Sequence, residues 1–452
     1  MIKAARQGWT EQEILDRIHA ASGTKEVRFR FDVLRNGATV RSVQASGSIT
    51  LNRFANIQRT AQFVLHEELD WLNEMLMPYM LIRMDAPQTP PAFALTWDER
   101  DAMDLSWDEW DALNYAWNTM DNAPVPTGCH DIGAWDDREK LNLMWQEWDD
   151  LDLTWDELDR GILCFSNQTE YWAEFPLGLF ILSSPKRDSK NGLNTWTVSA
   201  YDRTVILAED GITQPWYIPV GTAYMDAIQT LLISAGIDAV IVDGESDAVL
   251  KTAREFDPGT SKRSIINTLL SEINWNSIYC NADGIFVLSP YTVPSESDVS
   301  YIYRVDELSI ISRDTASEAD YYNVPNVFLA IVSNPELEED YTATWENHDP
   351  LSPLSIENRG RRIVTNPPYQ PESTSSQAAL DAYVERLAFE ANQIYEKLSI
   401  STAINPLHER ADVIEIKDHP DDINGVWVES SWAINLSHED KMTHNFRRLV
   451  TI

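Results

Sequence analysis

The chain has 452 residues, of which 43% are hydrophobic, and its 72 acidic and 35 basic residues give a formal net charge of −37 at pH 7. This length exceeds what one hydrophobic core usually supports and predicts about three domains, while the acidic charge excludes a surface whose main role is to bind nucleic-acid phosphates. No apolar run reaches the ~18 residues of a membrane span, and the N-terminus lacks the apolar core of a signal peptide, so we expect synthesis and folding in a cytoplasm.

Residues 1–86 predict a short amphipathic helix followed by antiparallel strands. Thr10 is placed to cap a helix whose apolar residues, up to Ile18, recur at helical spacing. Apolar residues then alternate from Val27 to Val33, and Asn36-Gly37 is typical of a hairpin turn. Further strands are expected at residues 40–44, 60–66 and 78–84.

The segment 87–169 is an acidic, tryptophan-rich repeat. Its tryptophans recur every ten residues in two sets that are offset by 38 residues, and units such as Thr96-Trp97-Asp98-Glu99 form capping boxes. A ten-residue step misses whole helical turns by ~80°, so we predict consecutive short helices with the indole rings packed inside. A surface ladder that stacks on sugars is the alternative. As a candidate outward-facing interaction repeat we single out Trp97, Trp107, Trp110, Trp117, Trp135, Trp145, Trp148 and Trp155.

The stretch from Phe175 to Asp210 predicts a long-looped β-hairpin around which the first domain is organised. Its two apolar runs, Leu177–Leu182 and Trp196–Tyr201, are separated by a polar segment that contains Asn191-Gly192. We expect an apolar turn to follow and predict no catalytic residue in this stretch.

These residues carry a family resemblance. The runs 177–182 (LGLFIL) and 196–203 (WTVSAYDR) resemble the N-terminal barrel of phage tail-tip and baseplate hub proteins, in which a Pro-Tyr strand precedes them, as Pro78-Tyr79 does here. The resemblance therefore implies a discontinuous barrel domain, 1–86 and 170–215, interrupted by the repeat. The repeat itself resembles Thr-Trp-Asp-x-Leu repeats in tail proteins from phages of actinobacteria.

Residues 216–320 predict a mixed α/β middle domain. Helices are expected at 225–235 and 264–273, a strand at 237–242, and a hairpin at 277–288 that turns at Asp283-Gly284. The succession from Arg263 to Tyr291 resembles the middle domain of the hub family.

Residues 321–452 predict a second barrel domain. A strand is expected at 326–333, and the clearest apolar stripe predicts a long helix at 377–398. The stretch from Asn405 to Ile414 resembles the helix-to-strand passage of the second hub barrel. Further strands are expected at 399–403, 412–416 and 426–436.

No catalytic, cofactor or metal site is predicted. The one Cys/His/Asp cluster, Cys129-His130-Asp131, places neighbours on opposite faces of an extended chain, so a nucleophile there is the minor alternative to an incidental role. Cys164 and Cys280 lie far from it, without CxxC spacing. The eight histidines show no zinc-binding spacing.

One acidic stretch begins like a calcium loop. Asp150, Asp152 and Thr154 have the required spacing, but Trp155 and Gly161 stand where glycine and glutamate are needed. This excludes an EF-hand and leaves a looser carboxylate site open.

Together these features predict an α+β, mainly β chain with two tail-tube-like β-barrel domains, a mixed α/β middle domain and a Trp-rich insertion of short helices. The resemblance implies a non-enzymatic homotrimer in the tail tip of a siphophage virion, where it forms a ring below the distal tail protein. It also implies contacts with the tape measure protein and receptor-binding tail-tip proteins, and passage of DNA, without specific binding, along an acidic or neutral wall. The alternatives are a tail-associated cell-wall hydrolase and a carbohydrate-binding host-recognition tail protein.

Overall fold

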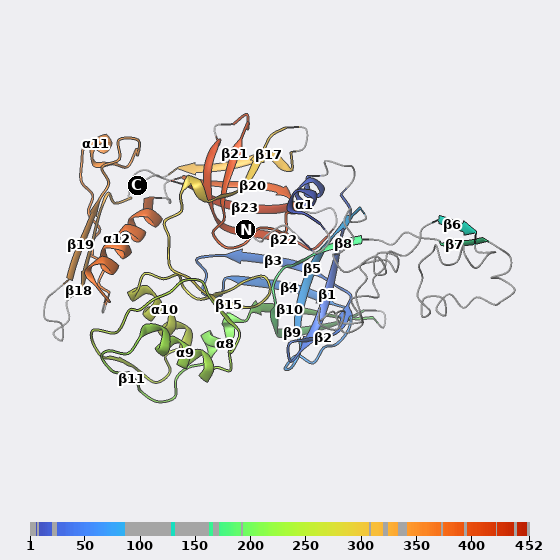
Figure 1. Ribbon diagram of the computed structural model, residues 1–452, viewed down its shortest axis with the longest axis horizontal. Helices are drawn as coiled ribbons and strands as arrows, with labels where there is room; N and C mark the ends of the chain where they lie inside the picture. The colour runs from blue at the N-terminus through green and yellow to red at the C-terminus, as the bar shows by residue number, and fades with distance from the viewer. Residues whose placement is uncertain are drawn as a thin grey trace, which may run out of the picture. The chain divides into compact units, whose positions relative to one another are not determined.

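The computed structural model (Figure 1) contains two compact units. One comprises the described residues of Val27–Leu81 and Phe175–Ile452, and the other those of Ala4–Glu26 and Ile82–Glu174. The structure describes Arg6, residues 9–19, 25–85, 171–190, 193–306, 309–319, 324–332, 341–371, 374–392, 396–421, 423–437 and 441–449, and the backbone of 128–131 and 162–165.

The first set of strands in the first unit is antiparallel, as predicted. Its hydrogen-bonded order is β3-β4-β10-β9-β5-β1-β2. Between β1 and β2, Asn36 and Gly37 adopt φ angles of 52° and 79°, as the Asn-Gly signal predicted. The strands are β1 Val27–Arg35, β2 Ala38–Val43, β3 Ala45–Asn52, β4 Arg59–Leu65, β5 Met75–Met84, β9 Phe180–Lys190 and β10 Leu193–Asp202.

The central hairpin of this set is longer than predicted. The polar segment expected to be a loop continues β9 as far as Lys190, which pairs with Leu193 at the start of β10. Ladder hydrogen bonds come from the backbone and need no apolar side chains, so an exposed polar segment can extend the strand. After β10, a short helix, α8 Thr204–Glu209, replaces the expected apolar turn.

The second set of strands has the order β17-β20-β23-β22, with β21 pairing with β22 and β16. The helix predicted at 377–398 was wrong at its end, because α12 spans Gln377–Asn392 and Leu398 lies in a strand, where it pairs with Phe446. Pairing with a neighbouring strand here outweighs local helix propensity. The strands are β16 Val299–Arg304, β17 Ile311–Ala319, β20 Glu396–Ala403, β21 Val413–Lys417, β22 Gly425–Asn435 and β23 Lys441–Arg448.

A single pair of strands joins the two sets. β22 runs antiparallel to β3, from Ser431 opposite Asn52 to Asn435 opposite Ser48. The mainly β fold with additional helices is therefore confirmed, but the described strands do not close into two separate barrels. Instead, β3, the last strand of the first set, pairs with the part of β22 that β21 leaves free.

The sheet nevertheless curls around packed cores. The rings of Phe31 on β1 and Phe63 on β4 lie 6.1 Å apart, and Phe63 lies 5.5 Å from Phe180 on β9. Because three strands separate β1 from β4 in the hydrogen-bonded order, this contact requires the first set to fold back on itself.

Two smaller α/β parts complete the first unit. In the first, α9 and α10 pack with the sheet β12-β15-β14 around a core that includes Ile228 and Ile266, as the sequence predicted. In the second, α12 packs Leu380 and Val384 on the hairpin β18–β19. The elements are β11 Trp216–Ile218, α9 Tyr224–Ser234, β12 Val240–Val242, β13 Arg254–Phe256, α10 Lys262–Glu272, β14 Tyr279–Cys280, β15 Phe286–Leu288, η1 Glu296–Asp298, β18 Val327–Val332, β19 Tyr341–Glu346 and α11 Ile356–Arg359.

The second unit begins with α1, Glu11–Ile18, and Thr10 caps it as predicted. Trp9 donates from Nε1 to the carbonyl oxygen of Asp85 (3.0 Å), and Arg6 donates from Nε to that of Glu174 (2.8 Å). The residues just before α1 therefore bind the backbone on both sides of the repeat, at Asp85 and at Glu174. The other strands are β8 Tyr171–Pro176, at the boundary of the units, and the antiparallel pair β6 Gly128–Asp131 and β7 Ile162–Phe165. None of the described helices is long and apolar enough to cross a membrane.

Replacing residues 87–168 with a short Gly/Ser linker should leave the rest of the chain folded, because the described cores draw on residues outside this segment. Circular dichroism and urea unfolding of the deletion variant test this. We expect a soluble protein with the unfolding midpoint of the parent, and loss of soluble protein would contradict the prediction.

Candidate functional site

The junction of β3 and β22 has a buried apolar face. Trp432 lies opposite Leu51 and Ile434 opposite Ile49, and all four side chains are buried. Directly opposed apolar pairs of this kind stabilise neighbouring strands. The junction is therefore a packed interface within one chain.

A buried arginine, Arg59 at the start of β4, connects the two strand sets. It is 2% exposed, and its Nη1 donates to the carbonyl oxygen of Leu177 (2.7 Å) while Nη2 donates to Oε1 of Glu409 (2.8 Å). Its guanidinium also lies 5.6 Å from the ring centroid of Trp432. A buried charge is tolerated only with a matched partner, so Glu409, outside the first set, holds this residue in place.

Three of the stretches that carry the family resemblance meet at Arg59. Leu177 belongs to the first, Glu409 to the 405–414 stretch, and Asp202 accepts the backbone N–H of Arg59 at Oδ2 (2.9 Å). Gly178 adopts a φ of +133°, and a Cβ there would lie 2.6 Å from Cδ of Arg59. The glycine is required because the arginine side chain approaches its backbone so closely.

Three donors surround a small cavity at this junction. Nε of Arg59, Nδ2 of Asn405 and Nε1 of Trp432 have no acceptor among the described residues, and all three residues line a cavity of about 10 Å³. A cavity of this volume has room for about one water molecule. The junction thus presents hydrogen-bond donors to a single small acceptor.

A buried carboxylate joins two histidines in the second strand set. Glu429 accepts hydrogen bonds from Nδ1 of His408 (2.7 Å) and Nδ1 of His444 (2.5 Å), which therefore both carry a proton. Nε2 of His408 lies 2.5 Å from the hydroxyl of Tyr303, and Nε2 of His444 lies 2.9 Å from that of Thr402. Every polar atom of the two rings is thus engaged.

Burial and charge together set the protonation of this cluster. Burial alone would raise the pKa of Glu429, but the charges and hydrogen bonds of the two histidines lower it to about 2. Burial alone would lower the pKa of His408, yet the charge and hydrogen bond of Glu429 raise it above its usual value. For His444 burial dominates and lowers the pKa. The favoured state is an ion pair of His408 and Glu429 beside a neutral His444.

The same three residues, His408, Glu429 and His444, are of types that can bind a metal ion. Their ligand atoms lie within 4.8 Å of one another. In this structure each ring nitrogen has a protein partner, and a ligating nitrogen must be free of its proton, so binding a metal ion would require these hydrogen bonds to break. We interpret the cluster as a hydrogen-bonded structural element.

The residues singled out from the sequence lie elsewhere. The eight repeat tryptophans, the calcium-like stretch and the side chains of Cys129, His130 and Asp131 are outside the described residues. Cys280 is buried on β14, and burial raises the pKa of its thiol well above the usual value. Sequence reasoning missed Arg59, although one signal was present, because it stands in phase with the buried alternate residues of β4.

The fold is similar to solved tail proteins. No known family profile matches the sequence, and no curated protein matches it. The tail protein from Neisseria meningitidis MC58 aligns with a TM-score of 0.53 at 12% identity, covering 93% of this chain and 97% of that one. The 43 kDa tail protein of prophage MuSo2 from Shewanella oneidensis aligns at 0.49 with 8% identity, covering 93% and 98%. A prophage tail protein from Listeria monocytogenes EGD-e aligns at 0.45 with 10% identity, covering 93% and 94%. The Neisseria structure confirms the tail-protein fold that the motifs predicted.

Replacing Arg59 with methionine should lower the free energy of unfolding by about 3–5 kcal/mol, because Glu409 is left without its partner. Urea unfolding of Arg59→Met measures this, and the double variant Arg59→Met/Glu409→Gln should recover part of the loss. As a control, Arg304→Met removes an exposed pair with Asp418 (3.9 Å) and should change stability by less than about 1 kcal/mol. Equal effects at the two sites would contradict the role of Arg59.

The free energy of unfolding should fall in acid as Glu429 becomes protonated. Its folded pKa of about 2 lies below the usual glutamate value of 4.5, so its stabilisation is present above about pH 4.5 and is lost as the pH falls towards 2. This stabilisation is on the order of 3 kcal/mol. Between pH 4.5 and 3, the unfolding free energy of Glu429→Gln should therefore fall less steeply than that of the parent chain. Between pH 7 and 4.5 it should fall more steeply, because His408 loses the carboxylate that raises its pKa. Parallel slopes in both windows would refute the assignment.

Proposed function

We propose that this chain is a structural subunit of a phage tail tip, where it forms the central hub ring of the virion. The observation that carries the proposal is the β3–β22 junction, which joins two antiparallel strand sets edge to edge within one chain. The hub resemblance implies two tube-like domains in one chain, so one chain would occupy two positions of a ring. The fold shared with the Neisseria tail protein supports this.

The sheet edges support assembly into a homotrimer. In the described part of the sheet, β17 and β2 end the main hydrogen-bonded order and β16 and β8 end its branches, so the edges differ from one another. Contacts between unlike edges are heterologous and form a closed ring when the rotation between subunits allows it. Three chains with two strand sets each would supply six positions, which matches a hexameric ring of distal tail protein above.

The remaining assignments rest on charge and on the shared fold. The ring would connect the tube to host-binding or cell-puncturing parts and let DNA pass, and the excess of 72 acidic over 35 basic residues would keep phosphates from sticking. The proposal includes a non-enzymatic role, which is consistent with the fold shared with the Neisseria tail protein. The 87–169 repeat would project from the ring as an interaction segment.

A reconstruction of the phage tail tip should show three copies of this chain, with the two strand sets of each copy at successive positions around the axis. The isolated chain can remain monomeric, because ring closure draws on neighbouring tail proteins. A map with six copies, or with a single copy, would contradict the proposed hub. As a control for the reconstruction, the distal tail protein and the tape measure protein must be resolved above the ring in the same map.

A further inference from the structure

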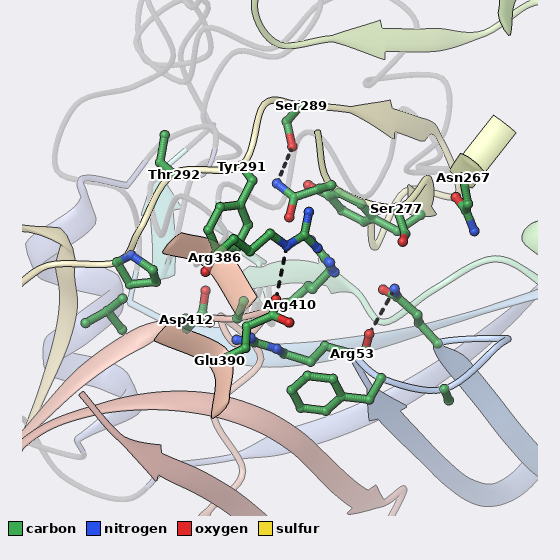
Figure 2. Close-up of a pocket in the computed structure, with 18 of the residues that line it drawn as sticks. Arg53, Asn267, Ser277, Ser289, Tyr291, Thr292, Arg386, Glu390, Arg410 and Asp412 are labelled. Carbon is green, nitrogen blue, oxygen red and sulfur yellow. Dashed lines mark hydrogen bonds and ion pairs between the residues drawn. The ribbon is translucent and has the colours of Figure 1, made fainter. Parts of the chain in front are cut away.

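A polar cavity of about 600 Å³ lies within the first unit, and Figure 2 shows the side chains that line it. The loop after β3 contributes Arg53, α12 contributes Arg386 and Glu390, and the loop before β21 contributes Arg410. Small-molecule sites commonly have volumes of ~300–1,000 Å³. The size therefore suits a small molecule, and the charged lining requires a polar one.

Of the three arginines, Arg386 has a carboxylate partner in the described part of the chain. Its Nε lies 3.2 Å from Oε1 of Glu390, and its Nη1 donates to the carbonyl oxygen of Trp275 (3.0 Å). The ring centroid of Tyr291 lies 4.3 Å from its guanidinium carbon. Arg386 and Glu390 thus form a fixed pair in one wall of the cavity (Figure 2).

The other two arginines contact aromatic rings. The guanidinium carbon of Arg53 lies 4.6 Å from the ring centroid of Phe54, and that of Arg410 lies 4.8 Å from the ring centroid of Tyr279. Nε of Arg410 is buried and finds no acceptor among the described residues. Aromatic rings hold guanidinium groups in place but do not neutralise their charge, so both groups keep the capacity to bind an anion.

Two more buried donors border the same cavity. Nε of Arg263 and the hydroxyl of Tyr291 have no acceptor in the part of the chain that the structure describes, and Arg263 is 4% exposed. Nη1 of Arg263 is bonded to Oδ1 of Asn56, which fixes the direction of its guanidinium. Buried donors without acceptors destabilise a fold, so two such groups on lining residues favour a ligand with acceptor oxygens.

Four arginines, Arg53, Arg263, Arg386 and Arg410, line the cavity together with three carboxylates, so the lining carries an excess of one positive charge. Asp412 also borders the cavity, but its carboxylate accepts the N–H of Glu409 (2.8 Å) and lies 3.5 Å from Nδ1 of His408. Asp298, another lining residue, caps its own turn.

The arginine pKa values reflect this crowding. Burial, and next the positive charge of Arg53, lower the pKa of Arg410 to about 10. Burial also lowers the pKa of Arg53, and the charge of Arg386 adds to that effect. A bound anion would relieve both the desolvation and the repulsion.

We propose that this cavity binds a phosphate monoester, with the phosphate held by Arg53 and Arg410 and oriented by the Arg386–Glu390 pair. A phosphate monoester carries nearly two negative charges at pH 7 and three strong acceptor oxygens, which suits a lining in which arginines outnumber carboxylates. Guanidinium groups bind phosphate oxygens through paired N–H bonds. The rest of the cavity leaves room for the organic part of the ligand.

Isothermal titration of the full chain in chloride buffer with inorganic phosphate and with phenyl phosphate tests the proposal. We expect saturable 1:1 binding of both probes, tighter for phenyl phosphate, and competition by sulfate. Arg410→Gln should weaken phenyl phosphate binding about tenfold or more, because a charge-assisted contact is lost. Arg53→Gln, in the loop after β3, should have the same direction of effect and replaces Arg410→Gln if that variant fails to fold.

Two further variants serve as controls for the binding experiment. Glu390→Gln removes the competing negative charge and should tighten phosphate binding severalfold, an effect that general damage to the fold would not produce. Arg362→Gln removes an exposed arginine paired with Glu346 and should leave binding unchanged. Absence of saturable binding by either phosphate probe would overturn the proposal. So would binding that both cavity arginine variants leave intact, or saturation by a hexaglutamate peptide alone, which would assign the cavity to a carboxylate partner.

Discussion

The buried charge of Arg59 is the constraint on which the two-part sheet depends. A guanidinium removed from water needs an anionic partner and acceptors for its donors, and the structure provides them from Leu177 and Glu409, which lie more than one hundred residues away in sequence. Asp202 fixes the backbone at the same point. The strand sets cannot separate without exposing or orphaning this charge, so an electrostatic requirement specifies which edges of the sheet pair.

Three consecutive residues, 408–410, connect the site of Arg59 to two other sites of the first unit. His408 enters the buried cluster with Glu429, Glu409 binds Arg59, and Arg410 borders the arginine-lined cavity. Trp432 pairs with His444 across β22 and β23 and contacts Arg59 on its other side. One short loop before β21 therefore couples the sheet junction, the buried histidine cluster and the cavity, and a displacement of that loop would reach all three.

The division of polar groups is itself informative. In the histidine cluster every ring nitrogen has a partner, and at the junction the charge of Arg59 is paired with Glu409, while the three unpaired donors there border a cavity of water size. In the cavity, donors and positive charges exceed their partners, and such an excess is maintained only where something else completes it. The same chain thus separates groups that hold the fold from groups that are available to a ligand.

Local patterns determined much of the secondary structure, including the turn at Asn36-Gly37, the cap at Thr10 and the helices of the middle part. These features depend on neighbours in sequence, where backbone geometry and alternation suffice to predict them. The end of α12, the polar extension of β9 and the pairing of β3 with β22 were decided by the tertiary structure. Strand pairing uses backbone groups that nearly every residue has, so the side-chain pattern of a strand does not predict which strand it pairs with. The role of Arg59 could not be predicted from the sequence for the same reason, because its partner Glu409 comes close only in the folded chain.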